Sequence, residues 1–328
     1  MSISPIEPIT PAWNHMVRIL FKPFDFKKWL LLGFCAFLAQ CGEGGGGNWG
    51  NGNISSGPSS DSDLNEVGNW ISNNVGLTIL IASGCVLLFV LVGLLITWLS
   101  SRGKFMLLDG IVKNRGAVKE PWTEFKTEGN SLFLFRIVVA ILAFVVILII
   151  GAIIAIIASP DIQTETFGAA GITAIIVGAI LIFAYIIFCI ALAFFISAFL
   201  VPTMYIQRVK SKEGMRIAWQ TLCKGNLGNA FLLGLMMFFL GIGVAVIGVA
   251  VTCATCCIAA LPYVSSVVFL PVIVFFTCYA LCYIQQFGPE WQCLDALCYS
   301  CGYDRQGLSF DKNCPECGNT NAAAPARR

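Results

Sequence analysis

The sequence predicts an all-α membrane protein with six transmembrane helices in three hairpins, cytoplasmic amphipathic helices and a small zinc-ribbon tail. Three observations predict this class. The 328 residues are 57% hydrophobic and only 12% charged, with a mean hydropathy of +0.82, well above the range of soluble domains. Uncharged stretches able to cross about 30 Å of hydrocarbon recur along the chain. The Lys and Arg residues all fall in alternate segments between those stretches.

The uncharged stretches place the spans in a membrane domain at residues 1–287. Their predicted ranges are 30–40, 77–99, 132–158, 172–200, 230–257 and 264–285. A span needs about 20 apolar residues, so the first is short and the other five are ample. The last two share the uncharged stretch 225–289, which could also hold three short spans. Two long spans around Pro262 are predicted.

The charges predict the orientation. Before the first span lie four basic residues, the segments 102–136 and 208–224 hold seven and five, and the tail holds four. The alternate segments carry acids only, namely Glu43, Asp61, Asp63, Glu66, Asp161 and Glu165. By the positive-inside rule both termini are cytoplasmic, in the inner membrane of a prokaryotic cell. The charges of the first 28 residues lie beside the apolar run, which argues against a cleavable signal peptide.

The segment 42–74 is rich in Gly, Asn and Ser and predicts a flexible extracytoplasmic loop. One alternative concerns its start. Leu38-Ala39-Gln40-Cys41 is similar to a bacterial lipoprotein box, in which Cys41 would be lipidated. Gln40 is bulky where such a box needs a small residue, so a plain span is favoured.

A weak internal repeat predicts three units, each a surface helix followed by a two-span hairpin. Apolar residues at helical spacing define the surface helices: Trp13, Met16, Val17, Leu20 and Phe21; Leu108, Ile111 and Val112; and Met215, Ala218, Trp219, Leu222 and Cys223. The spans that follow are predicted to begin at Asp25, Asn130 and Asn229, whose side chains can cap a helix. Chance similarity is the alternative, because amphipathic connectors are common.

Two short motifs carry a family resemblance. Phe21-Lys22-Pro23-Phe24-Asp25-Phe26-Lys27-Lys28-Trp29 and Glu120-Pro121-Trp122 stand before predicted spans. With the six-span order they make residues 10–287 resemble uncharacterised prokaryotic membrane proteins related to the membrane domain of glycerophosphoryl diester phosphodiesterases. The resemblance covers the membrane domain alone, so it implies none of the phosphodiesterase activity.

The 15 cysteines form two populations. Most lie in or beside spans, including Cys253, Cys256 and Cys257, and are interpreted as small apolar filler. The others form two CxxC pairs in a tail at 290–320, before a disordered end at 321–328: Cys298, Cys301, Cys314 and Cys317. Two thiolates on a tight turn can occupy adjacent corners of a tetrahedron, so this spacing predicts structural Zn²⁺. A reducing cytoplasm favours zinc over two disulfides.

The tail resembles short zinc ribbons, through Cys301-Gly302-Tyr303-Asp304 and Cys314-Pro315-Glu316-Cys317-Gly318. The glycine after each pair allows a positive φ near the sulfurs. Its charges are mixed in sign, whereas nucleic-acid ribbons carry a basic face. A cap or protein-docking module is therefore predicted, with a cytoplasmic protein partner and no nucleic acid.

Enzyme activity is not expected, because no hydrolase, phosphate-loop or zinc-protease motif occurs. The single histidine, His15, is expected on the polar face of the first surface helix. Two functions remain. One is a membrane scaffold or adaptor that contacts membrane lipids and docks proteins through its ribbon. The alternative is a transporter or channel for a lipid or small solute, with a path lined by polar residues such as Thr97, Tyr185, Thr252, Thr277 and Gln285. The scaffold is favoured.

Overall fold

The structure, a computed structural model, describes residues 3–41, 74–164, 168–254, 261–294 and 313–318. Within these ranges every regular element is a helix. The elements are α1 (Ile9–Phe21), α2 (Phe26–Gln40), α4 (Val75–Val112), α5 (Lys119–Glu124), α6 (Lys126–Thr164), α7 (Ala169–Phe195), η1 (Ile196–Leu200), α8 (Val201–Gln207), α9 (Ser211–Ile217), η2 (Ala218–Cys223), α10 (Leu227–Ala254), α11 (Pro262–Val268), α12 (Leu270–Ile284), η4 (Gln285–Phe287) and η5 (Pro289–Trp291). The predicted all-α class is confirmed over the described residues.

Five stretches in this part of the chain are long and apolar enough to cross a membrane: Val75–Val112, Lys126–Asp161, Ala169–Gln207, Leu227–Ala254 and Leu270–Phe287. They contain all or most of the last five predicted spans. Residues 255–257 of the predicted fifth span lie outside the described residues. So do residues 42–73 of the predicted loop and the predicted end at 321–328.

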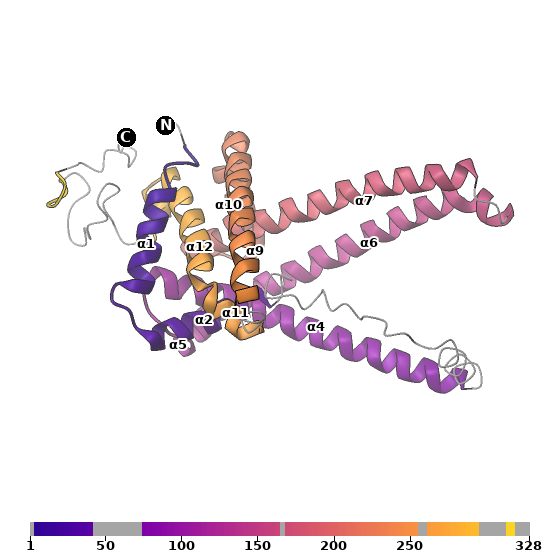
Figure 1. Ribbon diagram of the computed structural model, residues 1–328, viewed down its shortest axis with the longest axis horizontal. Helices are drawn as coiled ribbons and strands as arrows, with labels where there is room; N and C mark the ends of the chain where they lie inside the picture. The colour runs from indigo at the N-terminus through magenta and orange to yellow at the C-terminus, as the bar shows by residue number, and fades with distance from the viewer. Residues whose placement is uncertain (1–2, 42–73, 165–167, 255–260, 295–312, 319–328) are drawn as a thin grey trace.

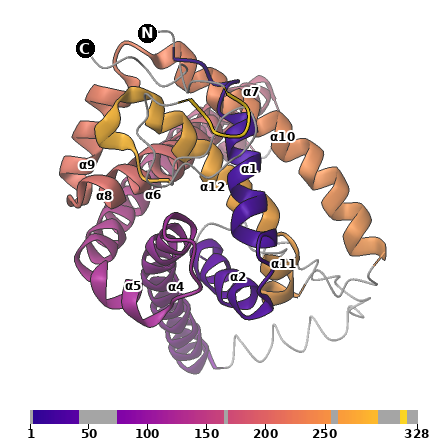
Figure 2. The same ribbon diagram turned by 90° about the vertical axis from the view of Figure 1, so that its left-hand side faces the viewer.

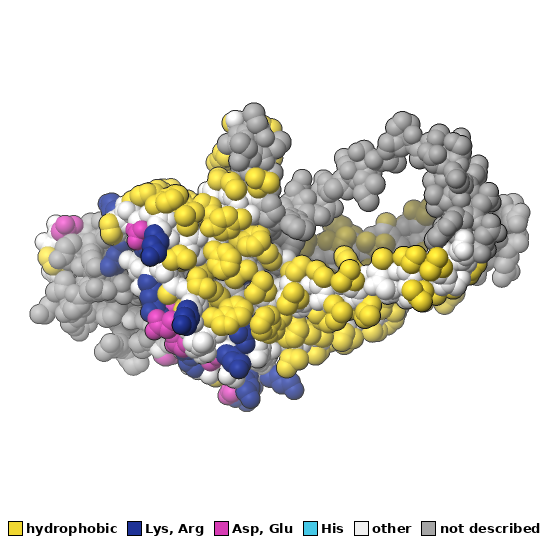
Figure 3. All heavy atoms as spheres, turned by 90° about the horizontal axis from the view of Figure 1, so that it is seen from below, with side chains coloured by type: hydrophobic (Ala, Val, Ile, Leu, Met, Phe, Trp, Pro, Cys, Tyr) yellow, Lys and Arg dark blue, Asp and Glu magenta, His cyan; other side chains and the backbone are white. Residues whose placement is uncertain are grey.

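The molecule consists of a compact body and projecting apolar arms (Figure 1). The body comprises α1, α2, residues 98–112 of α4, α5, η1, α8, α9, η2 and α12. The arms are residues 75–97 of α4, the paired helices α6 and α7, and α10, which leaves the body in a different direction. Phe89 on α4 is 81% exposed and Ile156 on α6 is 71% exposed. Such surfaces suit lipid rather than water, whereas Lys and Arg side chains gather on the body (Figure 3).

The C-terminal half of α12 forms the centre of the body, where Val274, Cys278 and Tyr279 are fully buried. Helix α1 packs along one side of α12, and the views in Figures 1 and 2 agree on this. The start of α12 is marked by Phe269, which separates it from α11 and has φ −89° and ψ 10°. Pro271 follows in the first turn of α12, where its missing N–H costs no hydrogen bond.

Helix α2 lies beside the body half of α4 rather than beside its apolar half. Gly103, Gly110 and Gly116 let the backbones approach so closely that an added Cβ would meet Ala39, Leu32 and Lys28 at 2.7, 2.6 and 3.0 Å, respectively. The two helices are therefore antiparallel over residues 28–39 and 103–116. With 15 residues, α2 is about 22 Å long, shorter than the other candidate spans. The hairpin expected between 30–40 and 77–99 is thus displaced toward the body.

One predicted surface helix and one predicted helix cap differ from expectation. The predicted second helix is continuous with α4, which runs unbroken to Val112 because residues 98–112 pack into the body. Asp25 caps α2 as predicted, accepting from the backbone N–H of Lys27 and Lys28. The predicted cap at Asn130 is wrong, because α6 begins four residues earlier, at Lys126, and the Asn130 side chain binds α4 instead.

The burial of His15 also corrects the sequence interpretation. Its side chain is only 6% exposed, because α1 turns His15, Met16 and Ile19 toward α12, whereas Trp13 is 57% exposed. The helix is amphipathic as expected, but its buried face is rotated from the predicted one. The contact with α12 determines which face of α1 is buried. The periodicity of the α1 sequence does not reveal this contact.

Candidate functional site

The most highly connected polar cluster of the described residues lies where α4, α5 and α8 meet in the body. We call it the charged junction, and it consists of Asp109, Lys113, Arg115, Glu120, Glu124, Tyr205 and Arg208. Six of its members lie in the segments 102–136 and 208–224, which the charge pattern assigns to the same side of the membrane. Tyr205 lies in the last turn of α8, directly before the second segment.

Asp109 is the centre of the charged junction, and its side chain is fully buried. One carboxylate oxygen, Oδ1, accepts from the Tyr205 hydroxyl at 3.2 Å and lies 2.7 Å from Lys113 Nζ. The other, Oδ2, accepts from Arg115 Nη2 at 3.1 Å. A buried carboxylate is tolerated only when it is paired and hydrogen-bonded, and Asp109 satisfies both conditions.

Glu124 at the end of α5 is the second carboxylate of the charged junction. It accepts from Lys113 Nζ at 3.1 Å and from Arg208 Nη2. The Arg208 guanidinium also lies over the ring of Phe125, 4.0 Å from its centroid. Arg208 ends α8 in the left-handed region, with φ 54°, and this turn directs its side chain back over α5.

The electrostatics of the charged junction favour fixed charges over proton transfer. The hydrogen bond from Arg208, assisted by Lys113, lowers the pKa of Glu124. Partial burial lowers the pKa of Lys113, but hydrogen bonds to Asp109 and Glu124 outweigh it and raise that pKa above its usual value. Both groups therefore hold their charges through the neutral range. General acid–base catalysis needs a pKa near the working pH, which these two groups lack.

A second polar contact joins the arms to the body. The guanidinium of Arg102 lies 4.7 Å from the ring centroids of both Trp98 and Trp122, which contact each other edge to face at 5.6 Å. Asn130 Oδ1 accepts from Arg102 Nη2 at 3.2 Å and from Trp98 Nε1 at 3.3 Å. This arrangement fixes the first turns of α6 against α4, and the sequence pattern gave no sign of it beyond the aromatic and basic residue types.

Hydrogen bonds also bring the N-terminal segment into the body. Lys28 Nζ donates to Asn114 Oδ1 at 2.6 Å. At the far end of the chain, Ser4 N donates to Gln286 Oε1 at 2.9 Å, and Gln286 Nε2 donates to Ser4 O at 2.8 Å. The Tyr279 hydroxyl donates to Pro5 O at 2.7 Å. Segments far apart in sequence thus meet in one body.

Of the predicted zinc ligands, Cys298 and Cys301 lie outside the described residues. Cys314 is 2% exposed, and Cys317 is exposed on the turn that follows it. Gly318 N donates to Cys314 O at 2.9 Å, and Gly318 has φ 70°, as the sequence predicted for this position. The tight turn and the two thiols fit one half of a four-sulfur zinc site. The described residues hold no group of three or more His, Cys, Asp or Glu side chains suited to a metal.

The polar residues suggested for a transport path are not brought together. The hydroxyls of Thr97, Thr252 and Thr277 each donate to the carbonyl four residues earlier in their own helix. Tyr185 donates to Ala143 O on the neighbouring helix α6. Gln285 begins η4 at the end of α12. Thr277 lines the cavity between α4 and α12.

Comparison with known proteins gives one match. The model of a family of unknown function, DUF7544, matches residues 3–264, which include α1 to α10 and the start of α11. No curated protein and no solved structure matches the chain. The cysteine tail lies beyond the matched residues.

Proposed function

This chain belongs to the DUF7544 family of unknown function, and we propose that it is a multi-pass membrane scaffold or adaptor with both termini in the cytoplasm. The charged junction and the N-terminal segment would form its cytoplasmic platform, and the zinc ribbon would dock a protein partner. The single observation that best supports this is the meeting of all the described basic segments in one hydrogen-bonded body, away from the apolar arms.

The contacts between segments support a shared side for both ends of the chain. Lys28 binds Asn114, Glu124 binds Arg208, and Ser4 binds Gln286. Groups that touch in one polar body lie on one side of the hydrocarbon, so the chain between each pair crosses an even number of times. The Ser4 and Gln286 pair supports a shared side for the N-terminus and the start of the tail.

The same reasoning supports a sixth crossing. Between Lys28 and Asn114 the chain contains the apolar half of α4, which accounts for one passage. A second passage is needed before Asn74, and α2 is the apolar helix available among the described residues. Because α2 lies beside residues 103–116, it would have to shift toward the apolar half of α4 to cross, and its length of about 22 Å would require the bilayer to thin locally. Lys27 and Lys28 stand at its start.

Helix α10 must turn for all spans to share one bilayer. Transmembrane helices tilt by about 0–40° from the membrane normal, so helices that cross together are roughly parallel. α10 leaves the body in a different direction from α4, α6 and α7 (Figure 1). Its connection to η2 contains Gly225 with φ 90°, a residue suited to a bend. We place the turn at this connection.

The absence of a converging polar path among the described residues favours the scaffold over a solute channel. The charged junction supports the same choice, because its groups are mutually paired and fix α4, α5 and α8 rather than present a reactive group. The zinc ribbon would supply a small folded surface, since metal binding can stabilise a segment too short for its own core.

Quantitative cross-linking in intact cells tests the scaffold. Cross-linking the full chain through its body lysines should capture the same cytoplasmic protein repeatedly, and the double variant Cys314→Ser/Cys317→Ser should lose it. Cys253→Ser is the matched control, since Cys253 lies on α10 away from the tail, and it should retain the partner. Equal capture by the double variant and the control would reject docking through the ribbon.

A further inference from the structure

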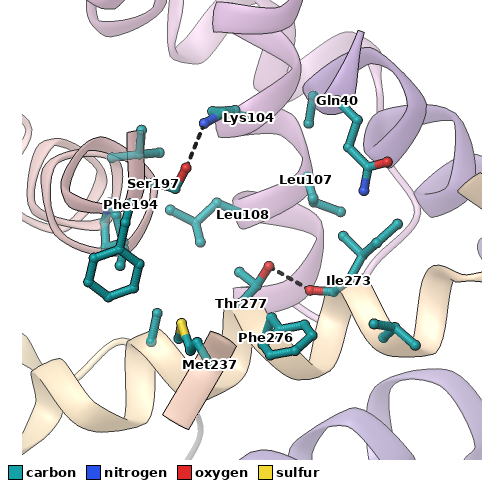
Figure 4. A pocket seen from close by; sticks show the side chains of 16 residues that line it. Gln40, Lys104, Leu107, Leu108, Phe194, Ser197, Met237, Ile273, Phe276 and Thr277 are labelled. Atoms are coloured by element: carbon teal, nitrogen blue, oxygen red, sulfur yellow. Dashed lines mark hydrogen bonds between the residues drawn. The ribbon is translucent and has the colours of Figure 1, made fainter. Parts of the chain in front are cut away.

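An apolar cavity of about 370 Å³ lies between α2, α4, α7, η1, α8, α10 and α12 (Figure 4). It is lined by Ala39, Gln40, Lys104, Leu107, Leu108, Phe194, Ser197, Ala198, Val201, Pro202, Met237, Val272, Ile273, Phe276, Thr277 and Ala280. Its volume falls in the range of small-molecule sites, about 300–1,000 Å³. Neither the charged junction nor the zinc tail contributes to it.

The cavity has one polar edge. Lys104 Nζ donates to Ser197 Oγ at 3.1 Å, and Figure 4 shows this pair on the opposite side of the cavity from Met237. Apolar side chains form most of the remaining wall, which also includes Gln40 and Thr277. A cation and a hydroxyl facing an apolar chamber are the features that an amphipathic anion requires.

The position of Lys104 along α4 matches the headgroup level of a bilayer. From Val75 to Ser101 the helix carries no charge, and Arg102 and Lys104 are the first charged residues. Arg102 contacts the rings of Trp98 and Trp122, whereas Lys104 lines the cavity. Lysines at the ends of spans place their ammonium groups at the headgroups.

The surroundings of the cavity identify its occupant as a lipid. Phe194 ends the arm α7, and Met237 lies on the arm α10, and both arms expose apolar side chains along their length. A molecule entering between them comes from the bilayer. We propose that the cavity binds one acyl chain of an anionic phospholipid, whose phosphate is held by Lys104 and Ser197. This site is distinct from protein docking by the tail.

Lipid titration of the purified full-length protein tests this site. Phosphatidylglycerol and phosphatidylcholine with identical acyl chains are added in detergent, and bound lipids are counted by native mass spectrometry. One phosphatidylglycerol should bind in preference to phosphatidylcholine. Lys104→Gln should weaken phosphatidylglycerol binding about five-fold, the usual contribution of one basic residue near an anionic headgroup. Lys212→Gln, an exposed lysine on α9, is the control and should bind normally.

A second variant separates binding from folding. Thr277→Phe fills the cavity from α12 without removing a charge and should abolish tight binding of either lipid, while thermal unfolding reports its stability. The proposal is overturned if both lipids bind equally, if Lys104→Gln matches Lys212→Gln, or if a folded Thr277→Phe variant still binds one phosphatidylglycerol. Retention of the lipid site in Cys314→Ser/Cys317→Ser would support its independence from the scaffold function.

Discussion

The hydroxyl of Tyr205 donates to the buried carboxylate of Asp109 at 3.2 Å, across 96 residues of chain. This bond ties α8, at the end of one apolar arm, to α4, at the end of another. Lys113 and Arg115 bind the same carboxylate and fix the turn after α4. The body therefore holds the ends of separate apolar helices in fixed positions relative to one another.

Removing the carboxylate at the centre of the charged junction should destabilise the body strongly. Asp109→Ala leaves Lys113 and Arg115 without their shared anion, and breaking a buried pair typically costs about 3–5 kcal/mol. Tyr205→Phe removes a single hydrogen bond to a charged group and should cost about 1.5–3 kcal/mol. Thermal unfolding of the detergent-purified variants measures both. An Asp109→Ala protein as stable as wild type would mean that the junction does not organise the body.

Arg102 should not be replaceable by lysine. Its planar guanidinium contacts the rings of both Trp98 and Trp122 and donates to Asn130, and the smaller ammonium of lysine cannot make all three contacts. Arg102→Lys should lower the free energy of unfolding by about 1–2 kcal/mol, by the usual strength of cation–π contacts. Arg216→Lys, at an exposed position on α9, is the control and should unfold as the wild type does. Identical transitions for both variants would contradict this role.

The ion pair of Glu124 with Arg208 and Lys113 should make stability depend on acid pH. The pKa of Glu124 is below its ordinary value of 4.5 in the folded protein, so its stabilisation is complete above that value. It is lost as the pH falls below 4.5 through the folded-state pKa. Wild type should unfold at a higher temperature than Glu124→Gln at pH 7, and the difference should shrink below pH 4.5. A difference that stays constant or grows on acidification would refute the pairing.

Zinc content tests the tail directly. The full chain purified without chelator should contain about one zinc per molecule, bound by Cys298, Cys301, Cys314 and Cys317. Cys314→Ser/Cys317→Ser should contain none, because two thiolates remain. Elemental analysis measures the ratio, and Cys253→Ser should retain the metal. Disulfides among these four cysteines in protein taken from cells under alkylating conditions would contradict both zinc binding and a cytoplasmic tail.

Helices marked by a regular pattern of apolar residues could be predicted from the sequence. Features that depend on contacts between distant segments, such as helix ends and buried faces, could not. The spans at 77–99, 132–158 and 172–200 could be predicted because a helix in lipid needs a long apolar run. The continuation of these helices into the body, such as Ser100 to Val112, could not be predicted. Those residues mix polar and apolar types, and only the glycine contacts with α2 explain their helix. His15 was misplaced for the same reason, since α12 determines which side of α1 is buried.

In the candidate sites, too, local features could be predicted and contacts between distant segments could not. The CxxC turn at Cys314 and Cys317 follows from local spacing, and Gly318 adopts the predicted positive φ. The charged residues of the junction were visible as a basic segment, but the pairing of Asp109 with Tyr205 depends on two helices meeting. No spacing in the sequence reveals the cavity beside Lys104, because its walls come from seven elements.

The most direct test of the account is the sidedness of the chain. A reporter active only in the cytoplasm and a complementary one active only outside are placed in turn at the N-terminus, at Gly57 and at the C-terminus of the full chain. The account predicts that both termini report the cytoplasm and that Gly57 reports the exterior, as expected when one of six crossings precedes Gly57. Termini on opposite sides, or Gly57 on the side of the N-terminus, would contradict it.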